Sequence, residues 1–101
     1  MSELEANEDI RSAEARTHEL KTWPEYFEAI RSGRKRFELR RNDRHFGEGD
    51  MLWLREYHPV TGTYTGRELQ ADITYVLRDP VFGLLSGYVI LSLSDVRERG
   101  E

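Results

Sequence analysis

The most regular pattern in this chain lies at residues 67–77, where apolar and polar side chains alternate without a break. The apolar members of the alternation are Leu69, Ala71, Ile73, Tyr75 and Leu77. A repeat of two residues is typical of a β-strand with one face on the core and the other toward solvent. Such a strand must bury its apolar face against other strands or a helix, so we expect a fold built on a sheet.

Shorter segments predict the remaining strands. Alternation predicts strands at residues 18–22, 36–41 and 51–57, and the segment 88–93 is almost continuously apolar. A continuous apolar run indicates a strand with neighbours on both sides. The connection at residues 59–66 is rich in Gly and Thr, which predicts a hairpin.

One segment has helical spacing instead. Its apolar positions are Trp23, Tyr26, Phe27 and Ile30. Thr22 and Glu25 have the spacing of an N-terminal capping box, and Gly33 predicts the end of the helix. The order is therefore strand, helix and four strands, which predicts an α+β, mostly β fold. We expect a small antiparallel β-barrel with one main helix after the first strand.

Charge divides the 101 residues into three parts. Residues 1–16 are acidic and lack aromatic side chains, so we expect a flexible N-terminal tail, and residues 95–101 are expected to form a charged C-terminal tail. Residues 17–94 form the domain, and their acidic and basic side chains balance. This balance argues against a strongly basic, non-specific nucleic-acid binder.

Several classes of protein are disfavoured by what the sequence lacks. There is no cysteine, no apolar run near the roughly 18 residues of a membrane span, and no hydrophobic signal core. We therefore expect a cytoplasmic protein without a membrane partner, and we assume a monomer. His18, His45 and His58 lack the spacing of paired metal ligands, and no phosphate-binding glycine loop is present, so neither a metal nor a cofactor is predicted.

Positive charge is concentrated between residues 31 and 44. The basic residues there are Arg31, Arg34, Lys35, Arg36, Arg40, Arg41 and Arg44. Only Glu38 and Asp43 oppose them. Such a cluster can bind phosphate, or it can be a well-solvated surface, and local potential governs this choice more than total charge.

Within the cluster, individual residues have two interpretations each. Lys21 and Lys35 are the only lysines among 15 basic residues. Either a compact ammonium is needed there, to bind a phosphate or to have a shifted pKa, or the two lysines remain at the surface by chance. Glu38 and Arg40 share a strand face. They form a structural ion pair, or Arg40 contacts phosphate while Glu38 orients a cation or accepts a hydrogen bond from an exocyclic amine. Arg41 and Arg44 flank a turn, where side chains position phosphate or are simply solvated.

Aromatic side chains are candidates for stacking on unpaired bases. The candidates are Trp23, Trp53, Tyr57, Tyr64 and Tyr88. Most aromatic side chains of a small domain belong to its core. Trp23 is the best candidate, because it lies at the start of the helix and next to Lys21, where it can border the same cleft.

The combination of motifs resembles the ASCH domain of the PUA-like superfamily. The resemblance rests on the helix 23–32, the pattern Gly33-x-Lys35-x-x-Glu38-x-Arg40, and Phe46-x-x-Gly49-Asp50 before a strand. The segments 18–23, 42–44 and 65–68 are similar to a small bacterial and phage ASCH-like family of unknown function. The resemblance covers about residues 17–93.

This resemblance implies a PUA-like β-barrel with a cleft beside the first helix, and a role in binding RNA or modified nucleosides. In some ASCH members a Lys, a Thr three positions later and a distal Glu form an amidohydrolase site for N4-acetylcytidine. Lys35 matches the Lys, whereas Glu38 stands at the Thr position and the insertion with the distal Glu is missing. Other members are reported to cleave RNA.

We therefore predict an RNA-binding module that reads unpaired or modified bases; single-stranded DNA is a further possible partner. The predicted binding residues are Lys21, Trp23, Lys35, Glu38, Arg40, Arg41 and Arg44. The alternative is a hydrolase acting on a modified nucleoside, or a ribonuclease, with Lys35 and Glu38 as catalytic residues. Binding is favoured because two of the three amidohydrolase residues are missing. A protein-interaction domain with an acidic partner is a third possibility.

Overall fold

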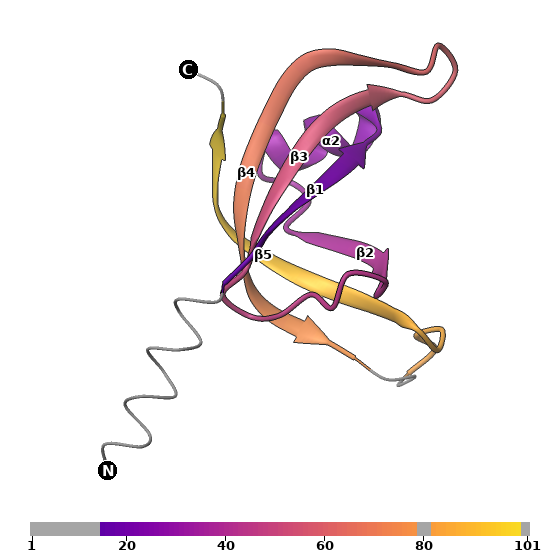
Figure 1. The fold of residues 1–101 in the computed structure, drawn as a ribbon, viewed down its shortest axis with the longest axis vertical. Helices are drawn as coiled ribbons and strands as arrows, with labels where there is room; N and C mark the ends of the chain where they lie inside the picture. Colours follow the sequence, from indigo (N-terminus) through magenta and orange to yellow (C-terminus); the bar gives the residue numbers. More distant parts are fainter. Residues whose placement is uncertain (1–14, 79–81, 100–101) are drawn as a thin grey trace.

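A computed structural model describes residues 15–78 and 82–99, and it shows a five-stranded sheet curled around one short helix (Figure 1). The elements are β1 (Thr17–Thr22), α2 (Pro24–Arg31), β2 (Phe37–Arg41), β3 (Met51–His58), β4 (Thr63–Leu77) and β5 (Tyr88–Glu98). This order of elements confirms the predicted strand, helix and four strands. The acidic tail predicted for residues 1–16 lies almost entirely outside the described residues. The charged tail predicted for residues 95–101 begins inside β5, which extends to Glu98 and pairs Arg97 and Glu98 with Gln70 and Leu69 of β4.

The strand order β1-β3-β4-β5-β2 places β1 and β2 at the two edges of the sheet. Strands β2 to β5 pair in antiparallel fashion, but β1 and β3 are parallel, from Thr17↔Met51 to Thr22↔Glu56. The expected antiparallel pairing therefore holds for every pair of neighbouring strands except β1 and β3. The reason is that the chain crosses through α2 and β2 before returning to β1, which is how parallel neighbours are connected. The sheet is a half-barrel, and no strand pairing between its described edges closes it.

The core lies between the concave face of the sheet and α2. Leu52, Leu54 and Leu91 are fully buried on the sheet, and Phe27 and Ile30 of the helix pack into the same cluster. The central position expected for β5 is confirmed, because it lies between β4 and β2. Within the described ranges, no helix is long and apolar enough to cross a membrane.

The alternation of β4 holds for only part of its length. Leu69, Ala71 and Ile73 are buried as predicted. The register shifts between Ile73 and Tyr75, and beyond this irregularity Val76 is buried while Tyr75 is exposed. A bulge adds a residue to one strand and reverses the faces that follow it, which a strict two-residue pattern does not anticipate.

The start of α2 differs from the prediction. Trp23 is the N-cap residue and makes no side-chain capping bond, so the predicted capping box of Thr22 and Glu25 is not formed. Thr22 is instead the last residue of β1, and its side chain points toward the interior. The helix therefore begins one residue later than a Thr22 cap would require.

The end of α2 fixes the backbone that follows it. Gly33 has φ 86°, in the left-handed region that glycine adopts without a steric penalty. Its N–H donates to the Ile30 carbonyl, and the N–H groups of Arg34 and Lys35 both donate to the Ala29 carbonyl, each at 3.0 Å. The first two bonds form a Schellman motif. Lys35 is thus held at a fixed place beside the helix.

Replacing Gly33 by alanine should lower the free energy of unfolding by about 1 kcal/mol. Apart from Gly33 and its two chain neighbours, no atom of the described residues lies within 4 Å of the position that the new Cβ would take, so the cost arises from the positive φ alone. Urea denaturation measures it. Gly66→Ala, with a similar φ of 96° and an equally open site in the hairpin, is the matched control and should cost about as much. An unchanged or higher stability of Gly33→Ala would contradict the motif.

Candidate functional site

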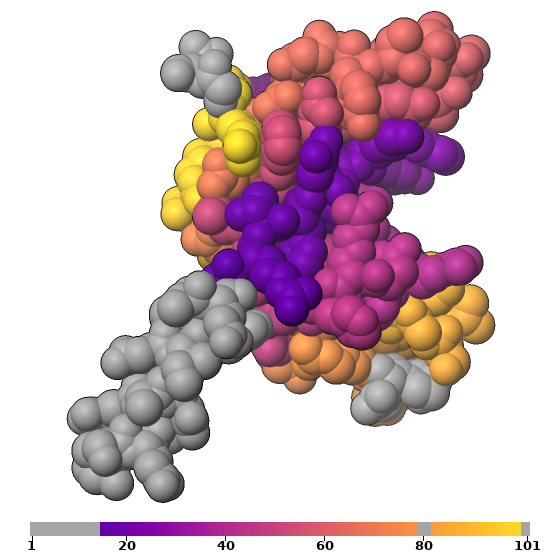
Figure 2. Space-filling view, in the orientation of Figure 1, coloured from indigo at the N-terminus to yellow at the C-terminus, as the bar shows by residue number. Residues whose placement is uncertain are grey.

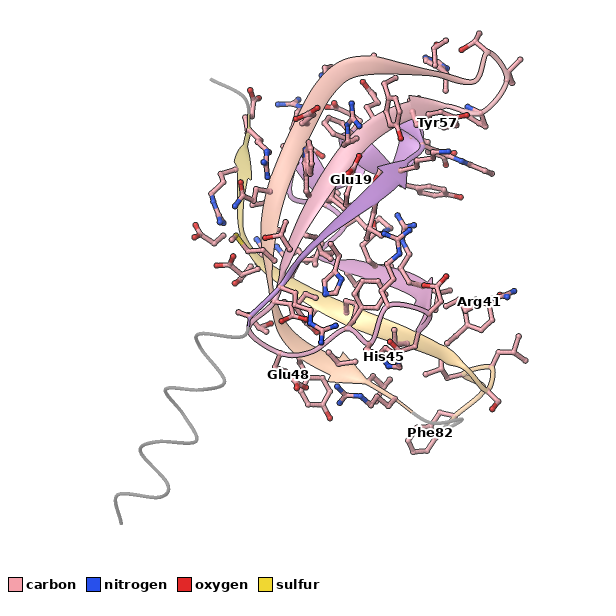
Figure 3. All side chains as sticks on the ribbon, viewed as in Figure 1. Glu19, Arg41, His45, Glu48, Tyr57 and Phe82 are labelled. Carbon is pink, nitrogen blue, oxygen red and sulfur yellow. The ribbon has the colours of Figure 1, made fainter. Side chains whose placement is uncertain are left out.

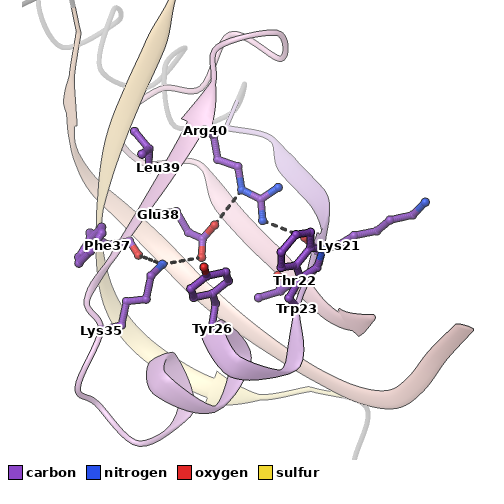
Figure 4. Close-up of a pocket in the computed structure, with 9 residues that line it drawn as sticks. All are labelled: Lys21, Thr22, Trp23, Tyr26, Lys35, Phe37, Glu38, Leu39 and Arg40. Carbon is purple, nitrogen blue, oxygen red and sulfur yellow. Dashed lines mark hydrogen bonds and ion pairs between the residues drawn. The ribbon is translucent and has the colours of Figure 1, made fainter. Parts of the chain in front are cut away.

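A cleft of about 560 Å³ opens between the end of β1, the start of α2 and the edge strand β2. Its lining from β1 and α2 consists of Lys21, Thr22, Trp23 and Tyr26. Its lining from the segment 35–40 consists of Lys35, Phe37, Glu38, Leu39 and Arg40 (Figure 4). In the space-filling view of Figure 2, the surface is hollowed between the indigo atoms of the first elements and the magenta atoms of β2. The volume is within the range of small-molecule sites.

Strand β2 turns its charged face inward and its apolar face outward. Glu38 is only 3% exposed, whereas Phe37 and Leu39 are 45% and 54% exposed. Burying a carboxylate is costly unless it is paired and hydrogen-bonded, and exposing large apolar side chains is unfavourable. An element with this orientation is unusual for a purely structural strand.

Glu38 is the centre of a chain of charged groups. Its Oε2 lies 3.2 Å from Lys35 Nζ, and its Oε1 accepts a 2.8 Å hydrogen bond from Arg40 Nε. The ammonium of Lys35 also donates to the Phe37 carbonyl at 2.7 Å. One carboxylate is therefore shared by two cations, which leaves a net positive charge beside the cleft.

Arginine side chains bridge the two edges of the sheet. Arg40 Nη2 donates to the Lys21 carbonyl at 2.9 Å, and Arg44 Nη1 donates to the Glu19 carbonyl at 2.6 Å. Both carbonyls belong to β1, an edge strand that has no strand partner on its outer side within residues 15–78 and 82–99. These side chains satisfy backbone groups that a neighbouring strand would otherwise pair. They tie β1 to the β2 side of the half-barrel without closing it.

Aromatic rings form the opposite wall. The rings of Trp23 and Tyr26 are stacked, with centroids 6.1 Å apart and planes inclined by 22°, and Trp23 is 51% exposed. Lys35 Nζ lies 5.6 Å from the centroid of the Tyr26 ring and 4.6 Å from that of Phe37, within cation–π range. A flat ligand in the cleft would meet ring faces and cations together.

Five of the seven predicted binding residues line this cleft: Lys21, Trp23, Lys35, Glu38 and Arg40. The ammonium of Lys21 lies 4.6 Å from the Tyr57 ring centroid, toward the hairpin. Arg41 and Arg44 are not part of the lining. The hydrogen bond and charge of Tyr88 raise the pKa of Arg41, whose side chain projects outward from the end of β2 (Figure 3).

The other aromatic candidates lie elsewhere. Trp53 donates its indole N–H to Glu68 at 2.9 Å, and its ring is covered by Arg99, whose guanidinium carbon is 4.1 Å from the centroid. Tyr64 is similarly covered by Arg55 at 3.9 Å. These rings on the outer face of the sheet are already engaged with arginines.

Sequence reasoning missed four residues of the cleft: Thr22, Tyr26, Phe37 and Leu39. Tyr26 follows Trp23 at helical spacing, and this spacing could have placed the two rings side by side. Phe37 and Leu39 gave no such indication, because apolar residues of an alternating strand are expected to face the core. The sequence predicts Thr22 as a helix cap, which gives no indication that it lines a cleft.

A second cluster of polar groups is buried away from the cleft. His18 Nε2 lies 2.9 Å from Asp50 Oδ2, and Asp50 also accepts hydrogen bonds from the backbone N–H groups of Arg16 and Gly47 at 3.1 and 3.0 Å. Burial tends to raise the pKa of Asp50, but the hydrogen bonds from His18 and the two amides outweigh it and lower the pKa. In the described ranges, no three His, Cys, Asp or Glu side chains are grouped to hold a metal ion.

These features define a small, mostly β domain in which a curled five-stranded sheet and one short helix enclose a charged, aromatic-lined cleft. The chain belongs to the family described as a domain of unknown function, DUF3850, whose model matches residues 17–93. It is also similar to the "Uncharacterized 12.9 kDa protein in GpA 3'region" of Escherichia phage P2. The two are 40% identical over 77 residues, which cover 76% of this chain and 67% of the phage protein. The family match contains every residue of the cleft.

Proposed function

We propose that this domain binds RNA in the cleft and holds an unpaired or modified base against the stacked rings of Trp23 and Tyr26. Phosphates beside the base would lie near Lys21, Lys35 and Arg40. The observation that carries the proposal is the exposed ring of Trp23 in a cleft whose other wall carries cations. Sequence-specific RNA recognition uses unpaired bases stacked on aromatic side chains, so this lining suits it.

The resemblance to ASCH and PUA-like domains supports the same function. This resemblance implies a β-barrel with a cleft beside its first helix. The half-barrel has a cleft at that place, and Lys35, Glu38 and Arg40 of the resembling motif line it. We also propose that the sheet is related to the closed barrel of PUA-like domains.

Affinity for phosphate should be modest. Glu38 neutralises part of the charge of Lys35 and Arg40, Arg40 is also bonded to a backbone carbonyl, and Arg41 and Arg44 lie outside the cleft. With one to three phosphate contacts, the logarithm of the binding constant should fall with the logarithm of salt concentration with a slope of about −0.7 to −2 on single strands. Fluorescence anisotropy with single-stranded RNA, duplex RNA and single-stranded DNA at two salt concentrations tests this.

Trp23→Ala should weaken binding of single-stranded RNA by about 5- to 150-fold, because base–aromatic stacking contributes roughly 1–3 kcal/mol. Its stability should change little, since half of the side chain is already exposed. Anisotropy titration measures the affinity. Tyr75→Ala is the matched control, because Tyr75 is an exposed ring of β4 outside the cleft, and it should bind as the unaltered protein does.

Equal weakening by Trp23→Ala and Tyr75→Ala would show that the cleft is not the RNA site. An absence of binding to every polymer would overturn the proposal, and free modified nucleosides would then be tested.

A second function is favoured by one contact. Lys35 Nζ lies 3.2 Å from the buried carboxylate of Glu38 at the edge of an open cleft, and a paired lysine and carboxylate can transfer protons in hydrolysis. This would make the domain a hydrolase of a modified nucleoside or of RNA. Chromatography of RNA and acylated nucleosides after incubation tests it: product must form with the unaltered protein and disappear with Lys35→Ala.

A further inference from the structure

Thr22 differs in its hydrogen bonding from the other buried polar side chains of residues 15–78 and 82–99. Its Oγ1 is the one buried side-chain nitrogen or oxygen there that has no hydrogen-bond partner. The residue is only 2% exposed, ends β1 directly before Trp23, and lines the cleft (Figure 4). Buried hydroxyl groups nearly always have a partner, so an unpaired one at the floor of a cleft requires an explanation.

Two polar side chains near Thr22, those of Glu56 and Arg40, have hydrogen-bond partners elsewhere. Glu56 is the partner of Thr22 in the parallel register, and it is also buried, but it accepts its 2.7 Å hydrogen bond from the Thr65 hydroxyl. Arg40 donates to the carbonyl of Lys21 and to Glu38. The hydroxyl of Thr22 does not cap α2 either. The fold thus makes no use of this group.

We infer that Thr22 is a specificity-determining residue of the cleft and that its hydroxyl hydrogen-bonds to the polar edge of an inserted base. This inference rests on the RNA-binding function proposed above. Because Thr22 and Trp23 are adjacent and line the same cleft, a base stacked on the indole brings its edge toward the hydroxyl. Thr22 is 2% exposed and lines the cleft, so the base would meet it with its edge, while the neighbouring phosphates would lie beside Lys21, Lys35 and Arg40.

The hydroxyl defines the class of ligand. It can donate or accept, so it matches a carbonyl, a ring nitrogen or an amino group on the base edge. A base of the same shape without polar atoms on that edge would leave the hydroxyl unpaired, and sites built around a buried polar group reject such ligands strongly. The site should therefore accept natural or modified bases with a polar edge and reject apolar isosteres.

The test compares single bases in one position. Labelled RNA strands are made abasic except at one central position, which carries each of the four natural bases or the apolar isostere 2,4-difluorotoluene. The unaltered protein should bind the best natural base about 10-fold more tightly than the isostere. Thr22→Val, which replaces the hydroxyl by a methyl group of similar size, should bind both equally. Thr17→Val, an exposed position of the same strand, should keep the 10-fold difference.

Stability separates this role from a structural one. Because the hydroxyl has no partner, Thr22→Val should leave the urea midpoint unchanged or raise it. A lower midpoint together with unchanged discrimination would show that Thr22 serves the fold, and would overturn the inference.

The binding results also distinguish the two proposals. If the unaltered protein binds no strand, the proposed function fails, and the inference fails with it. If it binds the natural base and the isostere equally, and Trp23→Ala abolishes both, the RNA site stands and only the role of Thr22 is overturned.

Discussion

Asp50→Ala is expected to lower the free energy of unfolding by about 3 kcal/mol, a large part of the 5–15 kcal/mol that such domains have. The Asp50 carboxylate is buried and accepts hydrogen bonds from His18 and from the backbone N–H groups of Arg16 and Gly47. Removing it leaves these donors without an acceptor, and each unsatisfied buried group costs about 1–3 kcal/mol. It also loosens the start of β1 from the loop before β3.

Urea denaturation at neutral pH measures the loss. Asp43→Ala is the matched control: it removes the same charge from an exposed site, where the carboxylate lies 3.8 Å from Arg44, and it should change stability by less than about 0.5 kcal/mol. Similar losses in the two variants would mean that general charge, and not the buried network, accounts for the effect.

The unaltered protein and Asp50→Ala should also differ in how their stability responds to acid. The pKa of Asp50 is lower in the folded protein than its ordinary value of 3.8, so the unfolded chain takes up the proton first as the pH falls. The contribution of Asp50 is therefore complete above that value and is lost below it. The stability difference between the unaltered protein and Asp50→Ala should shrink between about pH 5 and pH 2. Glu28, whose pKa is lowered to about 2 chiefly by its hydrogen bond from Arg31, is present in both and cancels.

The strands and the helix of this fold were predictable from the sequence, but the pairing and register of the strands were not. Alternation located β1 to β4, because a half-buried strand imposes a two-residue repeat, and a continuous apolar run located β5. The parallel pairing of β1 with β3 depends on where the chain travels between Thr22 and Met51, and no local pattern records that path. The reversal at Tyr75 depends on a bulge, which alternation likewise does not reveal.

The candidate site shows a similar division. The charged residues were found because basic clusters and the spacing of Lys35, Glu38 and Arg40 are visible in the sequence. Alternation in β2 showed that Phe37 and Glu38 lie on opposite faces but not which one faces inward. Hydrophobicity favours burial of Phe37, yet the structure buries Glu38. The pairing of Glu38 with two cations offsets the cost of its burial, and such pairing depends on tertiary contacts that a sequence pattern does not show.

Glu38→Gln is expected to lower the free energy of unfolding by about 2 kcal/mol. The amide keeps the shape of the side chain but loses the charge that Lys35 and Arg40 share, and its NH2 group would face one of the two cations. The cost is smaller than for Asp50 because both cations are partly exposed and regain water. Glu25→Gln, on the exposed side of α2, is the control with the same change of charge and should have little effect on stability.

The same substitution should tighten non-specific binding of single-stranded RNA. Without Glu38, the charges of Lys35 and Arg40 are no longer neutralised and become available to phosphate, so the salt slope should steepen by about 0.7 for each added contact. Glu25→Gln changes the net charge equally without freeing a cation, so its slope should stay near that of the unaltered protein. Equal slopes for the two variants would contradict a phosphate-binding role for Lys35 and Arg40.

Glu38→Gln also separates binding from hydrolysis, because loss of the carboxylate should increase affinity in a binding site but abolish turnover in a hydrolase. In a binding site, Glu38 restrains two cations, so its removal increases affinity for RNA and no product forms with either protein. In a hydrolase, Glu38 would transfer a proton beside Lys35, so product forms with the unaltered protein and disappears in the variant while RNA still binds. Tighter binding by Glu38→Gln without turnover in either protein would therefore favour the cleft as a site of recognition.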